Sequence, residues 1–528
     1  MQSIPILWKA NLIAFSSSFC VMVVELVAAR ILAPYIGVSL YTWTSIIGVI
    51  LAGIALGNYL GGKIADKLAS PSLLVTVLFA GTLATLSILP VSKAIGAIDW
   101  FSNLHLMLNS TLVVACIFLL PAIILSMVSP LVIKLTLADL GKTGGVVGTI
   151  YACSTVGSIL GTFMTGFYFI LWFGTRTTVW LVVAVLMLTG ILVWLSWKMP
   201  HRWTPSIQNV VIWIMAILIV LSTIVLFIFP ESWQQKYTRE SNYYSIQVLD
   251  YGDKASDATR SSSMKVLVLD HLIHSYVLLD DPTYFRYDYL SIFAGLVKYS
   301  VREKSAPAVL HLGGGGYSFP KYMEATYSGS LNNVIEIDPA VTQVAYQELG
   351  LPWETSIITY NQDARIFLHN QNTKTKYDFV IGDVFNDLTT PYHLTTLEFD
   401  KLVKASMKDN GIYLVNIIDS YKDGEYMPAF INTLKHAFKY VYLFSSLENY
   451  EKAPSSTFVI ASTDRRIDLE DFRRSILKSG EHVGLIYASD EIKLENYLAE
   501  KNPILLTDDY APTDILVAPL FRVRAERK

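Results

Sequence analysis

The sequence has few cysteines and few charged residues. The three cysteines, at positions 20, 116 and 153, all lie in apolar segments, so neither a disulfide framework nor a cysteine metal cluster is expected. Charged residues make up only 16% of the 528 residues, whereas hydrophobic residues make up 52%. This composition excludes a disordered chain, a collagen-like repeat and a small disulfide-stabilised scaffold, and it is too apolar for an ordinary soluble enzyme.

The charges that are present are distributed unevenly. Residues 1–230 contain ten of the 41 Lys/Arg and four of the 44 Asp/Glu, a net charge of +6, and residues 231–528 carry the remainder, a net charge of −9. We therefore predict a membrane domain over 1–230, with the lipid bilayer as its partner, followed by a part of soluble composition. Nucleic acid is not an expected partner, because binding phosphates requires a basic face.

Long apolar segments predict the membrane topology. A helix needs about 20 apolar residues to cross a bilayer. Seven segments satisfy this requirement: 10–33, 41–62, 73–92, 108–128, 146–171, 177–197 and 208–229. Glycines in the second and fifth segments favour close helix packing. Lysines and arginines concentrate after the second, fourth and sixth segments, which places the N-terminus in the cytoplasm and, with seven spans, the soluble part outside.

The soluble part begins with a predicted β-rich module over 231–283. Its strands are expected at 237–249 and 264–279, where Val, Tyr and Ile alternate with polar residues, and a helix is expected at 284–300. From 284 to 528 short apolar strands alternate with helical segments. The strands are predicted at 308–312, 331–337, 356–360, 377–382, 411–418, 440–444 and 457–461. This alternation is typical of a doubly wound α/β domain of the Rossmann type.

Glycines and acidic residues follow the first four of these strands in order. Gly313–Gly316, Glu336, Asp363 and Asp383 stand at successive strand ends, where such sheets bind their ligands. Glu336 is placed to accept hydrogen bonds from a ribose diol, Asp363 to bind an adenine amine, and Asp383 to face the space beyond the nucleoside. The glycine loop matches neither a dinucleotide nor a Walker A motif, so a ligand of the S-adenosylmethionine type is favoured. Taken singly, each residue could instead serve a tight turn or a helix cap.

Together, these features resemble the spermidine synthase (polyamine aminopropyltransferase) family. In its layout the whole chain resembles the bacterial membrane branch, in which several spans are fused to a synthase-like domain. The motifs that carry the resemblance are Leu269-Asp-His-Leu-Ile-His-Ser-Tyr276, Asp280-Asp-Pro-Thr-Tyr284, Gly313-Gly-Gly-Gly-Tyr317, Val334-Ile-Glu-Ile-Asp338, Asp363-Ala364, Tyr377-Asp-Phe-Val-Ile-Gly-Asp383, Pro391-Tyr-His-Leu-Thr-Thr-Leu-Glu-Phe399 and Leu506-Thr-Asp-Asp-Tyr-Ala-Pro512.

The resemblance implies an enzyme of polyamine biosynthesis that transfers an aminopropyl group from decarboxylated S-adenosylmethionine to an amine such as putrescine. It assigns Asp383 as the acid–base residue, Glu336 to the ribose and the pair Asp363-Ala364 to the adenine side. Tyr284 lines the amine site and is a second catalytic candidate, and His274 contacts the cosubstrate. The remaining candidates are Gly313, Gly314, Gly315 and Gly316 for the cosubstrate and Tyr287, Asp387, Pro391 and His393 for the amine. No metal is implied, because the leaving group is a nucleoside thioether.

Some residues depart from the family pattern. Gly316 stands where soluble members have an aspartate that binds the amine of the donor, and Arg286 stands where a glutamate is usual. A methyltransferase that uses intact S-adenosylmethionine on the same scaffold therefore stays an alternative. A transporter or sensor with a nucleoside- or polyamine-binding domain is another, because Glu25 and Arg30 lie within the first predicted span.

A multi-pass protein of the cell (inner) membrane is expected. A cytoplasmic synthase domain is favoured, despite the loop charges, because the cosubstrate is made there. Soluble relatives commonly form dimers, so a homodimer is possible.

Thr395 and Glu398 have the spacing of a helix capping box, and the turn Thr507–Tyr510 is interpreted as structural.

Overall fold

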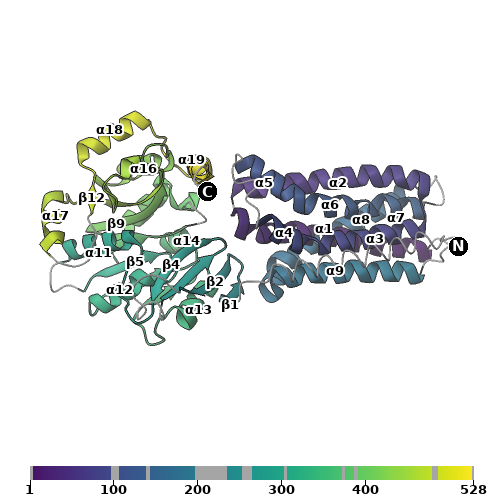
Figure 1. The fold of residues 1–528 in the computed structure, drawn as a ribbon, viewed down its shortest axis with the longest axis horizontal. Helices are drawn as coiled ribbons and strands as arrows, with labels where there is room; N and C mark the ends of the chain where they lie inside the picture. The colour runs from purple at the N-terminus through teal and green to yellow at the C-terminus, as the bar shows by residue number, and fades with distance from the viewer. Residues whose placement is uncertain are drawn as a thin grey trace. The chain divides into compact units, whose positions relative to one another are not determined.

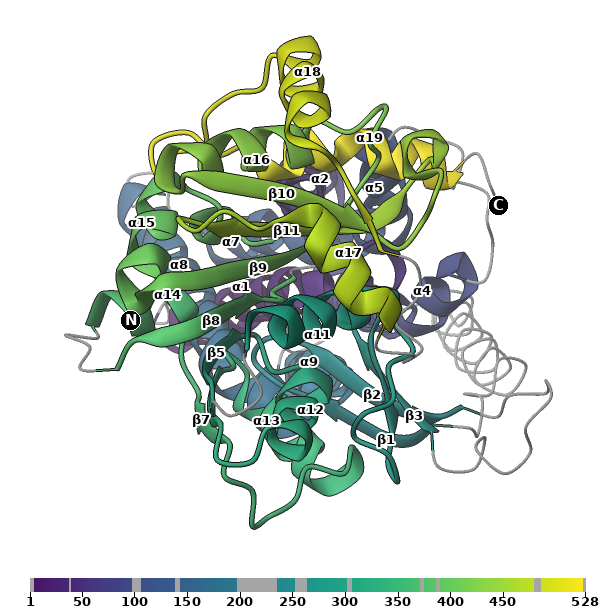
Figure 2. The same cartoon turned by 90° about the vertical axis from the view of Figure 1, so that its left-hand side faces the viewer.

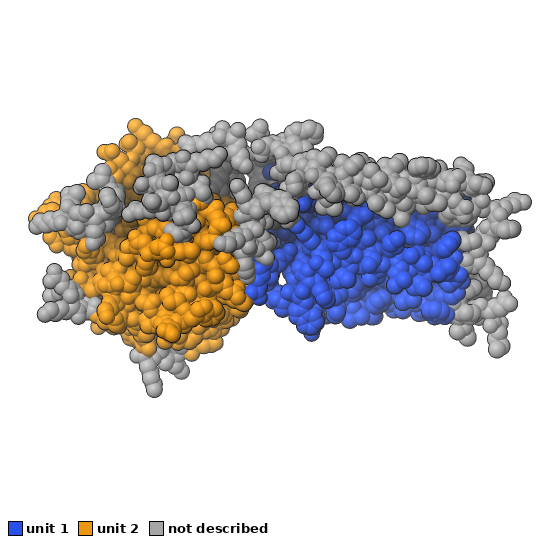
Figure 3. Space-filling model, turned by 60° about the horizontal axis from the view of Figure 1, so that its bottom comes forward, with its two compact units in different colours: residues 1–233, 239–245 blue, residues 234–238, 246–528 orange. Residues whose placement is uncertain are grey.

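The computed structural model describes residues 4–37, 39–96, 106–137, 143–196, 235–251, 264–301, 306–370, 375–385, 390–478 and 486–525. The chain divides into two compact units, coloured blue and orange in Figure 3. The helical unit comprises Met1–Trp233 and Arg239–Ser245, and the α/β unit comprises Gln234–Thr238 and Ile246–Lys528. The predicted boundary near residue 230 and the predicted span at 208–229 both lie outside the described residues.

The helical unit is a bundle of long apolar helices that lie side by side (Figure 1). Its elements are α1 (Ile4–Ile36), α2 (Leu40–Leu68), α3 (Pro71–Leu86), α4 (Ile88–Gly96), α5 (Leu106–Val114), η2 (Ala115–Leu119), α6 (Leu120–Ser126), α7 (Val128–Thr136), α8 (Thr143–Met164), η4 (Thr165–Phe169) and α9 (Ile170–Ser196). Five continuous stretches among the described residues are long and apolar enough to cross a membrane: Leu7–Ala33, Leu40–Leu68, Pro71–Ile95, Met107–Thr136 and Thr143–Ser196.

The predicted spans at 146–171 and 177–197 form one continuous helical stretch with a break at Gly174, whose φ is +74°. Along α8, Gly157 lies against Phe15 and Gly161 against Phe19, so α8 runs in the same direction as α1. Along α9, Val179 packs with the C-terminal part of α1, whereas Val193 packs with its N-terminal part. The chain therefore reverses at Gly174, and this stretch is long enough to cross a membrane twice.

Close helix contacts occur at the glycines that the sequence singled out. A Cβ atom on Gly53 would lie 2.6 Å from the Cβ of Ala122 in α6. A Cβ on Gly161 would lie 2.6 Å from the carbonyl oxygen of Phe19 in α1. Only glycine allows the backbones to approach this closely. Arg30, one of the two charged residues predicted within the first span, donates a hydrogen bond to the backbone carbonyl of Asn242.

A four-stranded sheet follows the helical bundle in the chain and consists of β1 (Gln235–Glu240), β2 (Ser245–Asp250), β3 (Met264–Leu269) and β4 (Leu272–Leu278), with β2–β3 and β3–β4 antiparallel. Each of the two predicted strands is thus split in two. The first is interrupted because the hydroxyl of Ser241 accepts hydrogen bonds from the backbone N–H groups of Tyr243 and Tyr244, which closes a turn. The second is interrupted at Asp270, whose φ of +56° reverses the chain.

The second sheet has eight strands in the order β12-β10-β11-β9-β8-β5-β6-β7. The strands are β5 (Ala308–Leu312), β6 (Leu331–Ile335), β7 (Ile358–Tyr360), β8 (Tyr377–Gly382), β9 (Met407–Asp419), β10 (Tyr440–Ser445), β11 (Ser456–Thr463) and β12 (Tyr487–Ala488). Strands β7, β6, β5, β8 and β9 are parallel, and β11, β10 and β12 add antiparallel pairs. The predicted Rossmann-type fold is confirmed, with a mixed rather than a fully parallel sheet.

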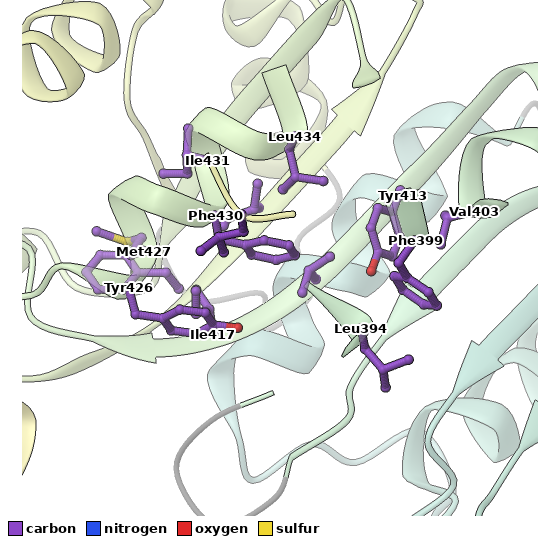
Figure 4. Close-up of a cluster of buried hydrophobic side chains, with 14 of the residues drawn as sticks. Leu394, Phe399, Val403, Tyr413, Ile417, Tyr426, Met427, Phe430, Ile431 and Leu434 are labelled. Carbon is purple, nitrogen blue, oxygen red and sulfur yellow. The ribbon is translucent and has the colours of Figure 1, made fainter. Parts of the chain in front are cut away.

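Helices cover both faces of this sheet (Figure 2). They are α11 (Asp288–Ser300), α12 (Ser318–Thr326), α13 (Pro339–Glu348), α14 (Ala364–Asn370), α15 (Leu397–Ser406), α16 (Tyr426–Ala437), α17 (Leu469–Lys478), α18 (Glu491–Lys501) and α19 (Thr513–Ala525), with short 3₁₀ turns at Tyr392–Leu394 and Tyr450–Lys452. Strand side chains alternate between the faces. Tyr413 and Ile417 of β9 face α15 and α16, where they pack near Phe399 and Phe430 (Figure 4).

The register of the parallel strands places several residues at one edge of the sheet. Leu312 of β5 pairs with Ile335 of β6 and with Gly382 of β8. Ile335 pairs in turn with Tyr360, and Gly382 with Val415. The residues that follow these five therefore form a row, at the carboxyl ends of β5, β6, β7 and β8 and within β9: Gly313, Glu336, Asn361, Asp383 and Asn416. This is the edge at which α/β sheets bind ligands.

Candidate active site

The loop after β5 requires glycine. Gly313 has a φ of +92° and Gly315 a φ of +48°, in the left-handed region that residues with a Cβ adopt only with strain. A Cβ on Gly313 would also overlap the carbonyl oxygen of Asp383 on the neighbouring strand. The loop therefore brings bare backbone to the edge of the sheet, where a ligand can approach it closely.

Glu336 holds this glycine loop in place. One of its carboxylate oxygens accepts hydrogen bonds from the N–H groups of Gly314 and Gly315, at 2.8 and 3.2 Å, and the other accepts one from the N–H of Asp338 at 3.0 Å. Burial raises the pKa of Glu336, and these backbone donors partly offset that rise by stabilising the carboxylate. A carboxylate has about four acceptor positions, so capacity remains for a ligand hydroxyl.

Asp363 is held by backbone donors and by a histidine. Its Oδ1 accepts hydrogen bonds from the N–H groups of Arg365 and Ile366 at the start of α14, which begins at Ala364. Its Oδ2 lies 2.9 Å from Nε2 of His393. The hydrogen bond from His393 lowers the pKa of Asp363 below its usual value. His393, predicted as an amine-site residue, thus lies on the predicted adenine side.

Asp383 is held by two side chains. The Tyr289 hydroxyl donates to Oδ2 at 2.8 Å, and the Asn416 side-chain amide donates to Oδ1 at 3.0 Å. Burial raises the pKa of Asp383, and the two donors limit that rise. A carboxylate with a raised pKa holds a proton more strongly than an ordinary aspartate, which suits a general base.

A cavity of about 540 Å³ lies beside these residues. Of the predicted site residues it is lined by His274, Tyr287, Asp383, Gly313, Gly314 and Gly315. Its aromatic wall is a chain of tyrosine rings, with Tyr276 5.2 Å from Tyr287 and Tyr287 5.8 Å from Tyr289 between centroids. Asp383 is the one acidic residue among the described lining residues, so it is the group available there to bind a cation.

The other predicted residues that the structure describes are not among those that line the cavity. Glu336 is hydrogen-bonded to Gly314, which lines the cavity. Tyr284 interacts through its side chain with Arg286, which also interacts with Tyr251. Asp387 falls among residues 386–389, outside the described residues. Gly316, Asp363, Ala364, Pro391 and His393 are also outside the described lining.

Ser275 occupies the space beside Gly316. Its hydroxyl accepts a hydrogen bond from the Gly316 N–H at 3.0 Å. A Cβ at position 316 would lie 2.6 Å from the Cβ of Ser275 and 2.9 Å from a methyl group of Val277. A larger residue at position 316 is therefore incompatible with the present position of β4.

Three residues of the site were missed by the sequence prediction: Tyr289, Asn416 and Ser275. Tyr289 lies on the buried face of α11 and resembles an ordinary core residue. Asn416 carried a usable signal, because it is a polar residue in the middle of the apolar strand β9. Its Oδ1 is buried without a hydrogen-bond partner beside the cavity, which leaves an acceptor for a ligand.

Comparisons with known proteins find polyamine aminopropyltransferases among the relatives of this chain. No family model matches the chain. The polyamine aminopropyltransferase of Vibrio vulnificus is 26% identical over 246 residues, 45% of this chain and 77% of that protein. The polyamine aminopropyltransferase 2 of Aquifex aeolicus is 26% identical over 118 residues, 21% of this chain and 24% of that protein. A crystal structure of a probable spermidine synthase from Corynebacterium glutamicum is 19% identical, with a TM-score of 0.44, over 52% of this chain and 97% of that chain.

Over 246 residues this chain is similar to a polyamine aminopropyltransferase. The protein is accordingly a transferase. Its long apolar helices are consistent with the membrane-fused branch of the family. Among the described residues no group of three or more His, Cys, Asp or Glu is arranged to hold a metal ion.

Proposed function

We propose that this aminopropyltransferase homologue moves an aminopropyl group from decarboxylated S-adenosylmethionine to an amine such as putrescine. The observation that carries the proposal is the position of Asp383, which is half-buried and lines the cavity in the same row as the glycine loop and Glu336. In this proposal the nucleoside of the donor lies on the glycine loop. Glu336 binds its ribose, and Asp363 binds its adenine amine.

Asp383 is the proposed general base. An amine is protonated at pH 7 and must lose a proton before it can act as a nucleophile. Its ammonium form is attracted to the Asp383 carboxylate and to the tyrosine faces of Tyr276 and Tyr287. As the proton passes to Asp383, the nitrogen forms a bond to the donor carbon next to the sulfonium. The carbon–sulfur bond breaks, its electron pair stays on sulfur, and methylthioadenosine leaves.

The test uses the full-length protein purified in detergent. It is supplied with decarboxylated or intact S-adenosylmethionine, each with and without putrescine and other amines, and the nucleoside product is identified. We expect methylthioadenosine only with the decarboxylated donor and an amine. S-adenosylhomocysteine from intact donor would instead show a methyltransferase. Tight nucleoside binding without any product would show a sensor or transporter.

We further propose that the helices anchor the enzyme in the cell membrane with the α/β unit in the cytoplasm, where its donor is made. Single cysteines at exposed positions such as Asp423 and Ile492, in a background with Cys20, Cys116 and Cys153 replaced by serine, test this in intact cells. We expect a membrane-impermeant maleimide to label them only after lysis. Labelling before lysis would place the unit outside. Light scattering of the purified protein tests the proposed homodimer.

A further inference from the structure

The turn near the C-terminus is tied to the nucleoside end of the site. The turn Thr507–Tyr510 is closed by backbone hydrogen bonds between these two residues in both directions, at 3.1 and 3.0 Å. Just before it, the carbonyl of the buried Leu506 accepts a hydrogen bond from the N–H of Leu397 at the start of α15. The turn is thereby fixed against a helix that follows the loop carrying His393.

Asp508, in this turn, is the centre of a polar network. Its carboxylate binds both terminal nitrogens of Arg365 and accepts a hydrogen bond from the Thr396 hydroxyl at 2.7 Å. Its N–H donates to the Glu398 carboxylate at 3.0 Å. The predicted capping box is thus wrong in detail: Thr396, not Thr395, caps α15, and Glu398 accepts from Asp508 rather than from the helix start.

Arg365 connects Asp508 to the predicted adenine-binding aspartate. One of its terminal nitrogens also donates to the backbone carbonyl of His393 at 2.9 Å. The ring of His393 is bonded to Asp363, and Asp363 in turn accepts a hydrogen bond from the N–H of Arg365. Arg365, His393 and Asp363 therefore form a closed set of contacts around the Asp363 carboxylate. Asp508 holds the side chain of Arg365 in position for these contacts.

We propose that Asp508 is a positioning residue for adenine recognition. It fixes Arg365, Arg365 fixes the loop that carries His393, and His393 sets the orientation of the Asp363 carboxylate. An arginine held by two parallel hydrogen bonds has a defined orientation, which a single contact would not impose. This inference rests on the proposed function, because it assumes that Asp363 binds an adenine amine.

The test measures nucleoside binding by calorimetry with the full-length protein in detergent. The two probes are methylthioadenosine and methylthioinosine, which lacks the 6-amino group. We expect Asp508→Asn to weaken methylthioadenosine binding about tenfold, the scale of one charge-assisted hydrogen bond, and to leave methylthioinosine binding unchanged. Asp509→Asn is the matched control, because Asp509 is an exposed neighbour outside this network. It should behave as the wild type.

Two further variants separate positioning from folding. Arg365→Lys keeps the charge but cannot form the two parallel hydrogen bonds to Asp508, so it should lower methylthioadenosine affinity to a similar degree. The double variant Asp508→Asn/Arg365→Lys should bind methylthioadenosine no more weakly than either single variant, because both substitutions break the same chain of contacts. In turnover, Asp508→Asn should raise the KM for the donor and change kcat less than about twofold.

The outcomes distinguish this inference from the proposed function. Equal loss of affinity for both probes, or a lower melting temperature with unchanged preference for adenine, would overturn the positioning role and leave the turn purely structural. Wild-type protein that binds neither probe would overturn the nucleoside site itself, and the inference with it. Discrimination by the wild type without any turnover would refute the transferase proposal while the effect of Asp508→Asn still decides the inference.

Discussion

The two ends of the site hold their carboxylates in different ways. At the nucleoside end, Glu336 and Asp363 accept hydrogen bonds mainly from backbone N–H groups of the loops beside them. At the transfer end, Asp383 accepts only side-chain hydrogen bonds, from Tyr289 and Asn416, in the described structure. Donors of both kinds stabilise the charged carboxylate, but the backbone donors at the first end also fix the shape of the loops on which the nucleoside is proposed to lie. Changes at the first end should therefore act on affinity, and changes at the second on rate.

The largest expected effect is at the transfer end. Asp383→Asn removes the group that accepts the proton of the amine, so kcat should fall by about 10²–10⁴-fold, the usual contribution of a general base. The affinity for methylthioadenosine should stay within about twofold, because the nucleoside contacts are untouched. Asp423→Asn, an exposed aspartate of the same unit, is the control. Normal turnover of Asp383→Asn would remove this residue from the mechanism.

At the nucleoside end, Glu336→Gln should lower the affinity for the nucleoside and change kcat much less. The glutamine amide can accept from the glycine loop through only one oxygen, so one of its N–H groups would face the donors that now bind Glu336. A buried donor without an acceptor costs about 1–3 kcal/mol, equivalent to about 5–150-fold in methylthioadenosine affinity. Calorimetry measures this loss, and kcat at saturating donor should change much less. A fall in kcat with unchanged affinity would contradict the division between the two ends.

The same contrast explains which parts of the site the sequence could predict. The glycines and acids after β5, β6, β7 and β8 are close to their strands in the chain, so strand prediction alone placed them at one edge. The partners of Asp383 are 94 and 33 residues away, and only the folded sheet and α11 bring them together. In the same way, the split of the first β strands depends on local turns at Ser241 and Asp270, which the alternation of apolar residues does not reveal.

A smaller effect is expected where β4 meets the glycine loop. Gly316→Ala places a methyl group 2.6 Å from the Cβ of Ser275, and overpacking of this kind typically costs about 1–3 kcal/mol. We expect the KM for the donor to rise several-fold. Ser275→Gly removes the opposing Cβ but also the hydroxyl that accepts from the Gly316 N–H, and the Val277 methyl stays close, so the double variant should recover only part of the loss. If the double variant is as impaired as Gly316→Ala while Ser275→Gly alone behaves as the wild type, the clash with Ser275 is not the cause.

The smallest effect on the maximal rate is expected for Tyr289→Phe. The Tyr289 hydroxyl stabilises the charged form of Asp383, so removing it should raise the pKa of Asp383 further above its ordinary value. A general base works only when deprotonated, so the rate should fall at low pH and stay near the wild-type value on the alkaline plateau. The acid limb of the profile of kcat against pH thus moves to higher pH. Tyr287→Phe is the matched control, because its hydroxyl donates to the Ile273 carbonyl instead. An equal shift in both variants, or a uniform loss of rate at every pH, would show that Tyr289 supports the wall of the cavity rather than the charge on Asp383.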